Sequence, residues 1–248
     1  SNGTKLFVTD RSNSRALIYD AIPTTNGAPA SVVVGHNTFT NGTSNDTDAL
    51  GFWKTGRSCV AAGKLLVADT SNNRVLIYNS IPSTNGAPAS VVIGQASLIS
   101  NAAGTSQTTL RAPAAVYSDG TKVFIADTGN HRVLIFNSIP TTNGTPASLV
   151  VGQSSFTAGT AGLAQTRMSS PGDVHIKNGK LVVADSSNHR VLIYNSIPTA
   201  NGAAASLVVG QSNFTTGTSG LASTKYNSPS GVHVNGAIGD NAYTIDLS

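Results

Sequence analysis

Acidic and basic side chains recur together along this sequence at one fixed spacing. In four segments an Asp is followed five residues later by an Arg, and the pairs are Asp10 with Arg15, Asp69 with Arg74, Asp127 with Arg132 and Asp185 with Arg190. A carboxylate next to a guanidinium can take part in acid–base chemistry. A pair that returns in every segment nevertheless has the distribution of a supporting element, because an active site needs to occur only once. We interpret the four pairs as structural ion pairs or hydrogen bonds.

Another set of side chains differs from segment to segment, as a binding site would require. Ten residues before the Asp of three segments lie Cys59, Tyr117 and His175, and a fifth, incomplete segment places His233 at the matching position. Cys and His are ligands for zinc and related metals. We take Tyr117, His175 and His233 as ligand-binding candidates and predict no metal and no cofactor, because isolated His residues on strands more often pack or form hydrogen bonds. A metal-dependent enzyme that uses His175 and His233 stays as an alternative.

The connection between the first two segments, residues 36–58, departs most from its counterparts. It contains Phe52, Trp53 and Arg57, which we predict to form a contact surface for a ligand. Aromatic and basic residues of this kind also bind RNA in other proteins. The chain has only 15 basic residues against 11 acidic ones, and no dense basic stretch occurs among them. Nucleic acid is therefore the less favoured partner.

These candidates are carried by an internal repeat of about 58 residues, whose copies are marked by Asp10, Asp69, Asp127 and Asp185. The third copy contains DTGNHRVLIFNSIPTTNGTPASLVVG, and the other three copies align with it. Its short apolar runs predict strands over 115–118, 122–126, 132–137 and 147–152. The sequence Asp-Thr-Gly-Asn at 127–130 predicts a tight turn in which Gly129 supplies positive φ.

Other repeated residues are predicted to hold the loops. Large apolar side chains three residues before a Pro are expected to fill the gap between neighbouring units, and these are Leu110, Met168 and Tyr226. Polar side chains directly after the fourth strand are interpreted as loop anchors, and these are His36, Gln95, Gln153 and Gln211. Asn residues in the tight turn are expected to bond the local backbone, and these are Asn13, Asn72, Asn130 and Asn188.

The repeat predicts an all-β fold. A four-stranded antiparallel unit cannot bury both faces alone, so copies must stack, and radial stacking gives a β-propeller of four-stranded blades. A solenoid is the competing geometry. We expect one domain over residues 1–248, with four full repeats and a partial fifth from about residue 229. Such a chain is also compatible with being part of a six-bladed array.

The phrase DTGNHRVLIF at 127–136 resembles the NHL repeat, a propeller family. The resemblance covers nearly the whole chain, and it implies the fold but no single function. In the peptide-amidating lyase of this family, the metal-binding His residues follow the Pro that opens the first strand of a blade. The matching residues here are Ala114, Gly172 and Ser230, which removes those ligands. The family's His position is occupied by His131 and His189, which we expect to be exposed.

Composition completes the prediction. Only 10% of the residues are charged, Cys59 is the only cysteine, and Gly, Ser, Thr and Asn are abundant. This composition resembles that of prokaryotic secreted and cell-surface proteins, with the periplasm as an alternative compartment. We predict a non-enzymatic binding or scaffold propeller without a membrane span. Its predicted partners are a protein, a peptide or a glycan, with self-assembly through the terminal strands as a further option. A lyase-like enzyme and an RNA-binding NHL propeller are the alternatives.

Overall fold

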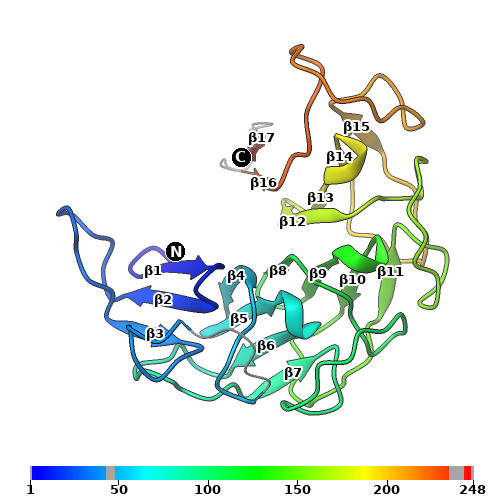
Figure 1. Ribbon diagram of the computed structural model, residues 1–248. Helices are drawn as coiled ribbons and strands as arrows, with labels where there is room; N and C mark the ends of the chain where they lie inside the picture. The colour runs from blue at the N-terminus through cyan, green and yellow to red at the C-terminus, as the bar shows by residue number, and fades with distance from the viewer. Residues whose placement is uncertain (1, 43–47, 235–242, 247–248) are drawn as a thin grey trace. The chain divides into compact units, whose positions relative to one another are not determined.

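The computed structural model describes residues 2–42, 48–234 and, for the backbone alone, 243–246. The described chain is all-β, with short 3-10 turns between strands (Figure 1). It contains two compact units. The first comprises Ser1–Gly104, Thr108–Val116 and Pro140–Thr145, and the second comprises Thr105–Gln107, Tyr117–Ile139 and Pro146–Ser248. The expectation of a single domain over 1–248 stays a prediction.

The first two sheets lie in the first unit. Sheet A has the order β1-β2-β3, with β1 at Leu6–Asp10, β2 at Arg15–Tyr19 and β3 at Val32–Val34. Sheet B has the order β4-β5-β6-β7, with β4 at Thr55–Ala61, β5 at Lys64–Asp69, β6 at Arg74–Tyr78 and β7 at Val91–Ile93. All of the strand pairs are antiparallel. Sheet B therefore has the predicted four-stranded plan.

Three further sheets follow. Sheet C has the order β11-β10-β9-β8, with β8 at Ala115–Ser118, β9 at Val123–Asp127, β10 at Arg132–Phe136 and β11 at Leu149–Val151. Sheet D has the order β12-β13-β14-β15, with β12 at Pro171–Lys177, β13 at Lys180–Asp185, β14 at Arg190–Tyr194 and β15 at Leu207–Val209. Sheet E pairs β16 at Gly231–Val234 with β17 at Tyr243–Asp246. The four strands predicted for the third repeat are thus confirmed, the last one shorter at both ends.

The turn after the second strand differs from the prediction. Residues 70–72, 128–130 and 186–188 form 3-10 turns. Positive φ falls on the residue after each turn, where Asn73, His131 and His189 have φ of 52°, 53° and 53°. Gly129 is not a positive-φ residue, so its proposed role in the turn was wrong. The 3-10 turn moves the left-handed position two residues further on, to the point where the chain reverses into the next strand.

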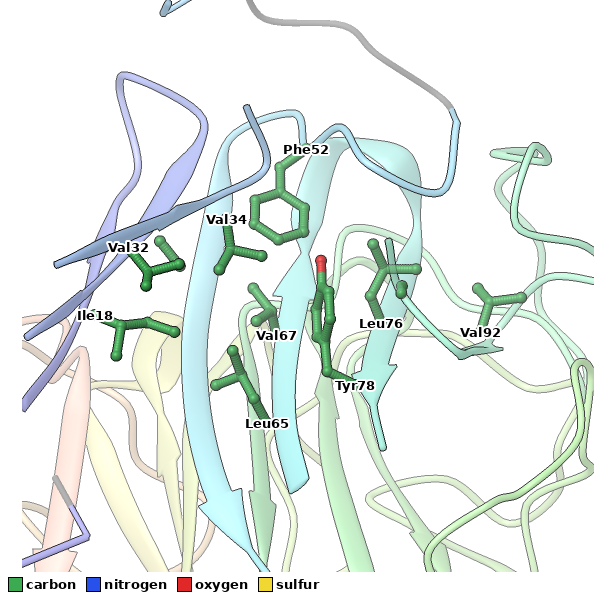
Figure 2. Packing of buried hydrophobic residues seen from close by; sticks show 11 residues of the cluster. Ile18, Val32, Val34, Phe52, Leu65, Val67, Leu76, Tyr78 and Val92 are labelled. Carbon is green, nitrogen blue, oxygen red and sulfur yellow. The ribbon is translucent and has the colours of Figure 1, made fainter. Parts of the chain in front are cut away.

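Sheets A and B pack against each other in the first unit. Their buried apolar side chains form one cluster (Figure 2), to which sheet A contributes Ile18, Val32 and Val34 and sheet B contributes Leu65, Val67, Leu76, Tyr78 and Val92. Because alternate residues of a strand point to opposite faces, each blade offers one apolar face to the neighbour before it and one to the neighbour after it. Stacking buries both faces, which a single sheet cannot do.

A large apolar side chain from each crossover fills the space beside the glycine that ends the fourth strand. A methyl group on Gly94 would lie 2.6 Å from the Leu110 side chain, and one on Gly152 would lie 2.9 Å from Met168. Phe52 occupies the same place against Gly35 and is fully buried. Phe52 is therefore a core residue, and its predicted place on a ligand-contact surface was wrong. Its apolar ring fills a gap that only a side-chain-free residue leaves open.

Candidate functional site

Buried ion pairs stabilise three of the four tight turns. The Nε atoms of Arg74, Arg132 and Arg190 each lie 2.7 Å from the carboxylate of the Asp five residues earlier, and all of these side chains are fully buried. The Arg15–Asp10 pair has a similar distance, 2.8 Å, but stays partly exposed. Burial raises the pKa of Asp69 and Asp185, and the neighbouring guanidinium opposes this rise.

Each buried guanidinium also holds the loops on both sides of its blade. Arg190 donates to the carbonyl oxygens of Ala164 at 3.0 Å and Arg167 at 2.9 Å in the preceding crossover, and to Phe214 O in the following one. Arg74 makes equivalent contacts with Gly51 O and Leu98 O. Every nitrogen of the Arg190 guanidinium is engaged in this way and its side chain is fully buried, so the group has no accessible face for a substrate.

Residues at the left-handed position link each repeat to the next one. The backbone N–H of Ser170 donates to His131 Nδ1 at 3.0 Å, and that of Ser228 donates to His189 Nδ1 at 3.0 Å. In an earlier repeat, Asn73 Oδ1 accepts from the N–H of Ala112 at 2.8 Å. Both His side chains are only half exposed, so the expectation that they are exposed was wrong. They are acceptors in a hydrogen bond between repeats.

The glutamines behave as loop anchors. Gln95 Nε2 donates to the carbonyls of Asn73 and Ala102, both at 2.9 Å, which closes the loop after β7. Gln153 and Gln211 make the matching contacts. Two basic residues reinforce these anchors, because Arg167 Nη1 donates to Gln153 Oε1 at 3.0 Å and Lys225 Nζ donates to Gln211 Oε1 at 3.1 Å. Basic side chains that an RNA-binding face would need are thus partly engaged in holding loops.

Three of the variable first-strand residues form a row of rings in the second unit. The ring centroids of Tyr117 and His175 are 4.5 Å apart at an interplanar angle of 63°, and those of His175 and His233 are 4.5 Å apart at 50°. We call Tyr117, His175 and His233 the ring row. Its members come from β8, β12 and β16, the first strands of three successive repeats. Cys59 holds the equivalent place in β4 of the first unit.

Hydrogen bonds fix the ring row to the backbone. Tyr117 OH donates to the carbonyl of Ile176 at 3.1 Å, and His175 Nδ1 accepts from the N–H of Val234 at 3.2 Å. A third bond of this kind comes from Asp173, whose Oδ2 accepts from the N–H of Val232 at 3.0 Å. The sequence prediction did not include Asp173, because an acidic residue occurs at this position in one repeat only. Its separation of two residues from His175 on one strand was the available signal.

The electrostatics of the row follow from burial. Burial, the charge of His233 and the charge of Lys177 lower the pKa of His175 to about 4. His175 is therefore neutral near pH 7, and with Nδ1 as an acceptor its proton lies on Nε2. His233 at the other end is exposed. Among the described side chains no three or more His, Cys, Asp or Glu residues are grouped so that they could hold a metal ion. The row can therefore offer ring faces and polar ring edges to a ligand.

The remaining candidates lie apart from the row along the chain. Trp53 is half-buried, and its backbone N–H donates to Asp69 Oδ1 at 2.7 Å. Arg57 is exposed, and its backbone N–H donates to the carbonyl of Ala114 at 2.8 Å. Both belong to the first unit, whereas the ring row belongs to the second. The structure thus groups three of the six ligand-binding candidates and buries a fourth.

The model of the NHL repeat matches residues 168–194, which run from the crossover before β12 through the tight turn to the end of β14. This segment is an NHL repeat. The matched segment contains the Asp185–Arg190 pair and His189, so the family's repeat coincides with the buried pair and the bond between repeats. The internal repeat places similar segments in the other three copies. No curated protein sequence matches the chain.

Two solved structures illustrate the fold that this chain shares with known proteins. A protein of Bacteroides uniformis named a "putative 6-phosphogluconolactonase" is 14% identical over 95% of this chain and 59% of its own, with a TM-score of 0.54. A protein of the same name from Bacteroides fragilis is 15% identical over 95% and 58%, with a TM-score of 0.52. The chain thus spans less than two thirds of the length of either protein. At such identities the likeness shows the fold alone, a β-propeller of four-stranded antiparallel blades.

None of the helices in the described part of the chain has the length and hydrophobicity needed to traverse a bilayer.

Proposed function

We propose that this NHL-repeat chain is a non-enzymatic binding module that recognises a protein, a peptide or a glycan through the ring row. The repeated charged residues do not compete for this role, because their side chains are buried and paired within the blades. The ring row differs from repeat to repeat and is not needed to form a blade. Variation on a constant scaffold is what a recognition surface requires.

The exposed ring of His233 is the observation that carries the proposal. The ring of His233 packs at a tilt of 50° against His175, which accepts a hydrogen bond from the N–H of Val234 and also contacts Tyr117. A ring supported in this way loses little conformational freedom when a ligand stacks on it, so the binding free energy is better retained. Aromatic and imidazole rings supply apolar area together with a polar edge, which suits peptide side chains and sugar rings.

Binding to arrays of peptides and glycans tests this function. A ligand found in the screen is titrated against the parent chain and the His233→Ala variant, with Thr199→Ala in an exposed loop as the matched control. We expect His233→Ala to lower the affinity for the ligand about tenfold or more, and Thr199→Ala to leave it unchanged. Equal affinity of the parent and His233→Ala would show that the ring row is not the binding surface.

The same titrations separate the alternative functions. A ligand contact that depends on a metal disappears when a chelator is present, which would favour the lyase-like enzyme with His175 and His233. An affinity for RNA that falls steeply with salt and with Arg111→Ala or Arg167→Ala would favour the RNA-binding propeller. Binding that survives both the chelator and moderate salt supports the interaction module.

We further propose a secreted or cell-surface location. The support is the composition, with 10% charged residues and abundant Thr, Ser and Asn. Protease treatment of intact cells of the source organism tests the proposal. Loss of the protein from intact cells, with a cytosolic marker retained, is expected. Protection of the protein until the cells are lysed would contradict a surface location.

A further inference from the structure

One repeat closes the open edge of the repeat before it through an Asn-Gly dipeptide. Asn85 Oδ1 accepts from the N–H of Val33 at 3.0 Å, and the N–H of Gly86 donates to the carbonyl of Val33 at 3.1 Å. The same two bonds recur twice. They join Val92 to the Asn143-Gly144 dipeptide and Val150 to the Asn201-Gly202 dipeptide, at distances of 2.9–3.2 Å.

These two hydrogen bonds, which we call the Asn-Gly bridge, satisfy backbone groups at the edge of a sheet. The fourth strand of each blade is an edge strand, and its middle residue directs a backbone N–H and C=O away from the sheet. The Asn-Gly dipeptide supplies one acceptor and one donor, as a paired strand would. Positive φ at Gly86, Gly144 and Gly202, between 62° and 64°, gives the loop the conformation that reaches both groups. The three bridged Val residues are fully buried as a result.

Strand β15 has no such cover in the described part of the chain. Leu207 is 54% exposed and Val209 is 37% exposed, whereas the matching residues of β7, Val91 and Ile93, are buried. Leu221 in the following crossover is fully exposed. Its counterpart Leu163 instead packs on Gly217 of the next crossover. Strand β15 is therefore an apolar edge strand like β3, β7 and β11, but in the described part of the chain no Asn-Gly dipeptide bonds to it.

The first repeat presents the complementary loop. Its Asn26-Gly27 dipeptide is exposed, and Gly27 has a φ of 70°, close to the value in the three bridging loops. Ile22 in this loop is 52% exposed and Pro23 is exposed, whereas Pro82 at the matching place in the second repeat is buried. The loop and the β15 edge are both uncharged, so their contact desolvates no ionised group.

We propose that the β15 edge of one copy of this protein binds the Ile22–Gly27 loop of a second copy. Asn26 Oδ1 accepts from the N–H of Val208, and the N–H of Gly27 donates to the carbonyl of Val208, which repeats the bridge already present three times within the chain. The two surfaces are different, so the contact is heterologous, and the pair keeps a free loop on the first copy and a free edge on the second. The proposal does not rest on the ring row.

Two variants with opposite defects test this contact. The double variant Ile22→Lys/Asn26→Ala removes the contacts of the loop and leaves the β15 edge intact. The double variant Leu207→Lys/Val209→Lys removes the contacts of the edge and leaves the loop intact. All four residues are exposed, so folding is retained. Sedimentation velocity of the parent over a range of concentrations is expected to show species heavier than the 25.2 kDa monomer. Each double variant alone is expected to associate at least about tenfold more weakly than the parent. The control Thr25→Ala, in the same loop, is expected to associate as strongly as the parent.

A mixture of the two double variants tests directly whether the β15 edge binds the loop. Equal amounts of the two variants are expected to form a one-to-one dimer, because the intact edge of the first variant meets the intact loop of the second. A parent chain that stays monomeric at every concentration would overturn the proposal. So would association of the parent that neither variant weakens, or variants whose mixture behaves as the two do separately. Binding through the ring row has no influence on any of these outcomes.

Discussion

Arg74, Arg132 and Arg190 are among the largest fully buried side chains in the chain. A buried guanidinium is costly to desolvate, and the cost is offset only when all of its donors find acceptors. Here one Asp and carbonyls from two crossovers supply these acceptors. At the scale of the residue, the pair is thus the point at which the local turn and two distant loops are joined. The ion pair of Arg15 with Asp10 is partly exposed, so desolvation of Arg15 costs less and its removal should destabilise the fold less.

This difference predicts unequal effects of removing the arginines. We expect Arg132→Ala to lower the free energy of unfolding by about 3–5 kcal/mol, because it leaves Asp127 buried without its counter-ion. Arg15→Ala, at the partly exposed pair, should cost about 1 kcal/mol or less. Urea denaturation of the two variants and the parent measures both values. Equal losses would mean that burial of the pair does not govern its contribution.

His175 makes stability depend on pH. Its pKa is lowered from 6.5 to about 4 in the folded chain by burial and by the charges of His233 and Lys177. The folded state therefore disfavours protonation. The stabilisation is fully present above pH 6.5 and is lost as the pH falls toward 4, with a total on the order of 3 kcal/mol or less.

The control for this effect is His175→Gln, which keeps an acceptor for the N–H of Val234 but does not titrate. The free energy of unfolding of the parent minus that of the variant should be constant above pH 6.5. It should decrease between pH 6.5 and 4. A difference that is the same at pH 7.5 and pH 4.5 would contradict a lowered pKa. The His residues that do not contact His175 are common to both proteins and cancel.

At the scale of the element, the turn between the second and third strands does more than reverse the chain. The residue that leaves the 3-10 turn has positive φ and accepts a hydrogen bond from the next repeat. The side chain there must supply an acceptor and tolerate the left-handed region. Asn meets both requirements, as Asn73 shows, and His meets them through Nδ1.

The turn therefore predicts which substitutions are tolerated. His131→Asn should change the free energy of unfolding by no more than about 0.5 kcal/mol, because an Oδ1 atom can replace Nδ1. His131→Ala leaves the N–H of Ser170 without its acceptor and should cost about 1–2 kcal/mol. Thermal or urea unfolding compares the two. If the variants lose the same amount, the hydrogen bond to Ser170 makes no net contribution.

At the scale of the whole molecule, the sequence was informative where a pattern repeats. The repeat and its apolar runs placed the strands of the third repeat within a residue or two, because period and alternation determine a blade. The ring row was foreseen as far as equivalent strand positions allow. The hydrogen bonds that join Tyr117 and His175 to the backbone of the next repeat were not, since a hydrogen bond to a backbone N–H or C=O requires no particular residue type. Phe52 was misplaced because aromatic character alone does not distinguish a core side chain from a surface one.

Many of the hydrogen bonds between repeats share one chemical property. A side chain from one repeat meets a backbone group of the other, as in Asn143 with Val92, His189 with Ser228 and Tyr117 with Ile176. The accepting or donating backbone group is present whatever residue occupies the position, proline apart. These hydrogen bonds therefore require almost no matching of side chains between repeats, in contrast to the apolar faces and the ring row, where side chain packs against side chain. A unit of about 58 residues that keeps its apolar faces can be duplicated, deleted or exchanged by recombination and still form these hydrogen bonds, so duplication can lengthen the array and deletion can shorten it.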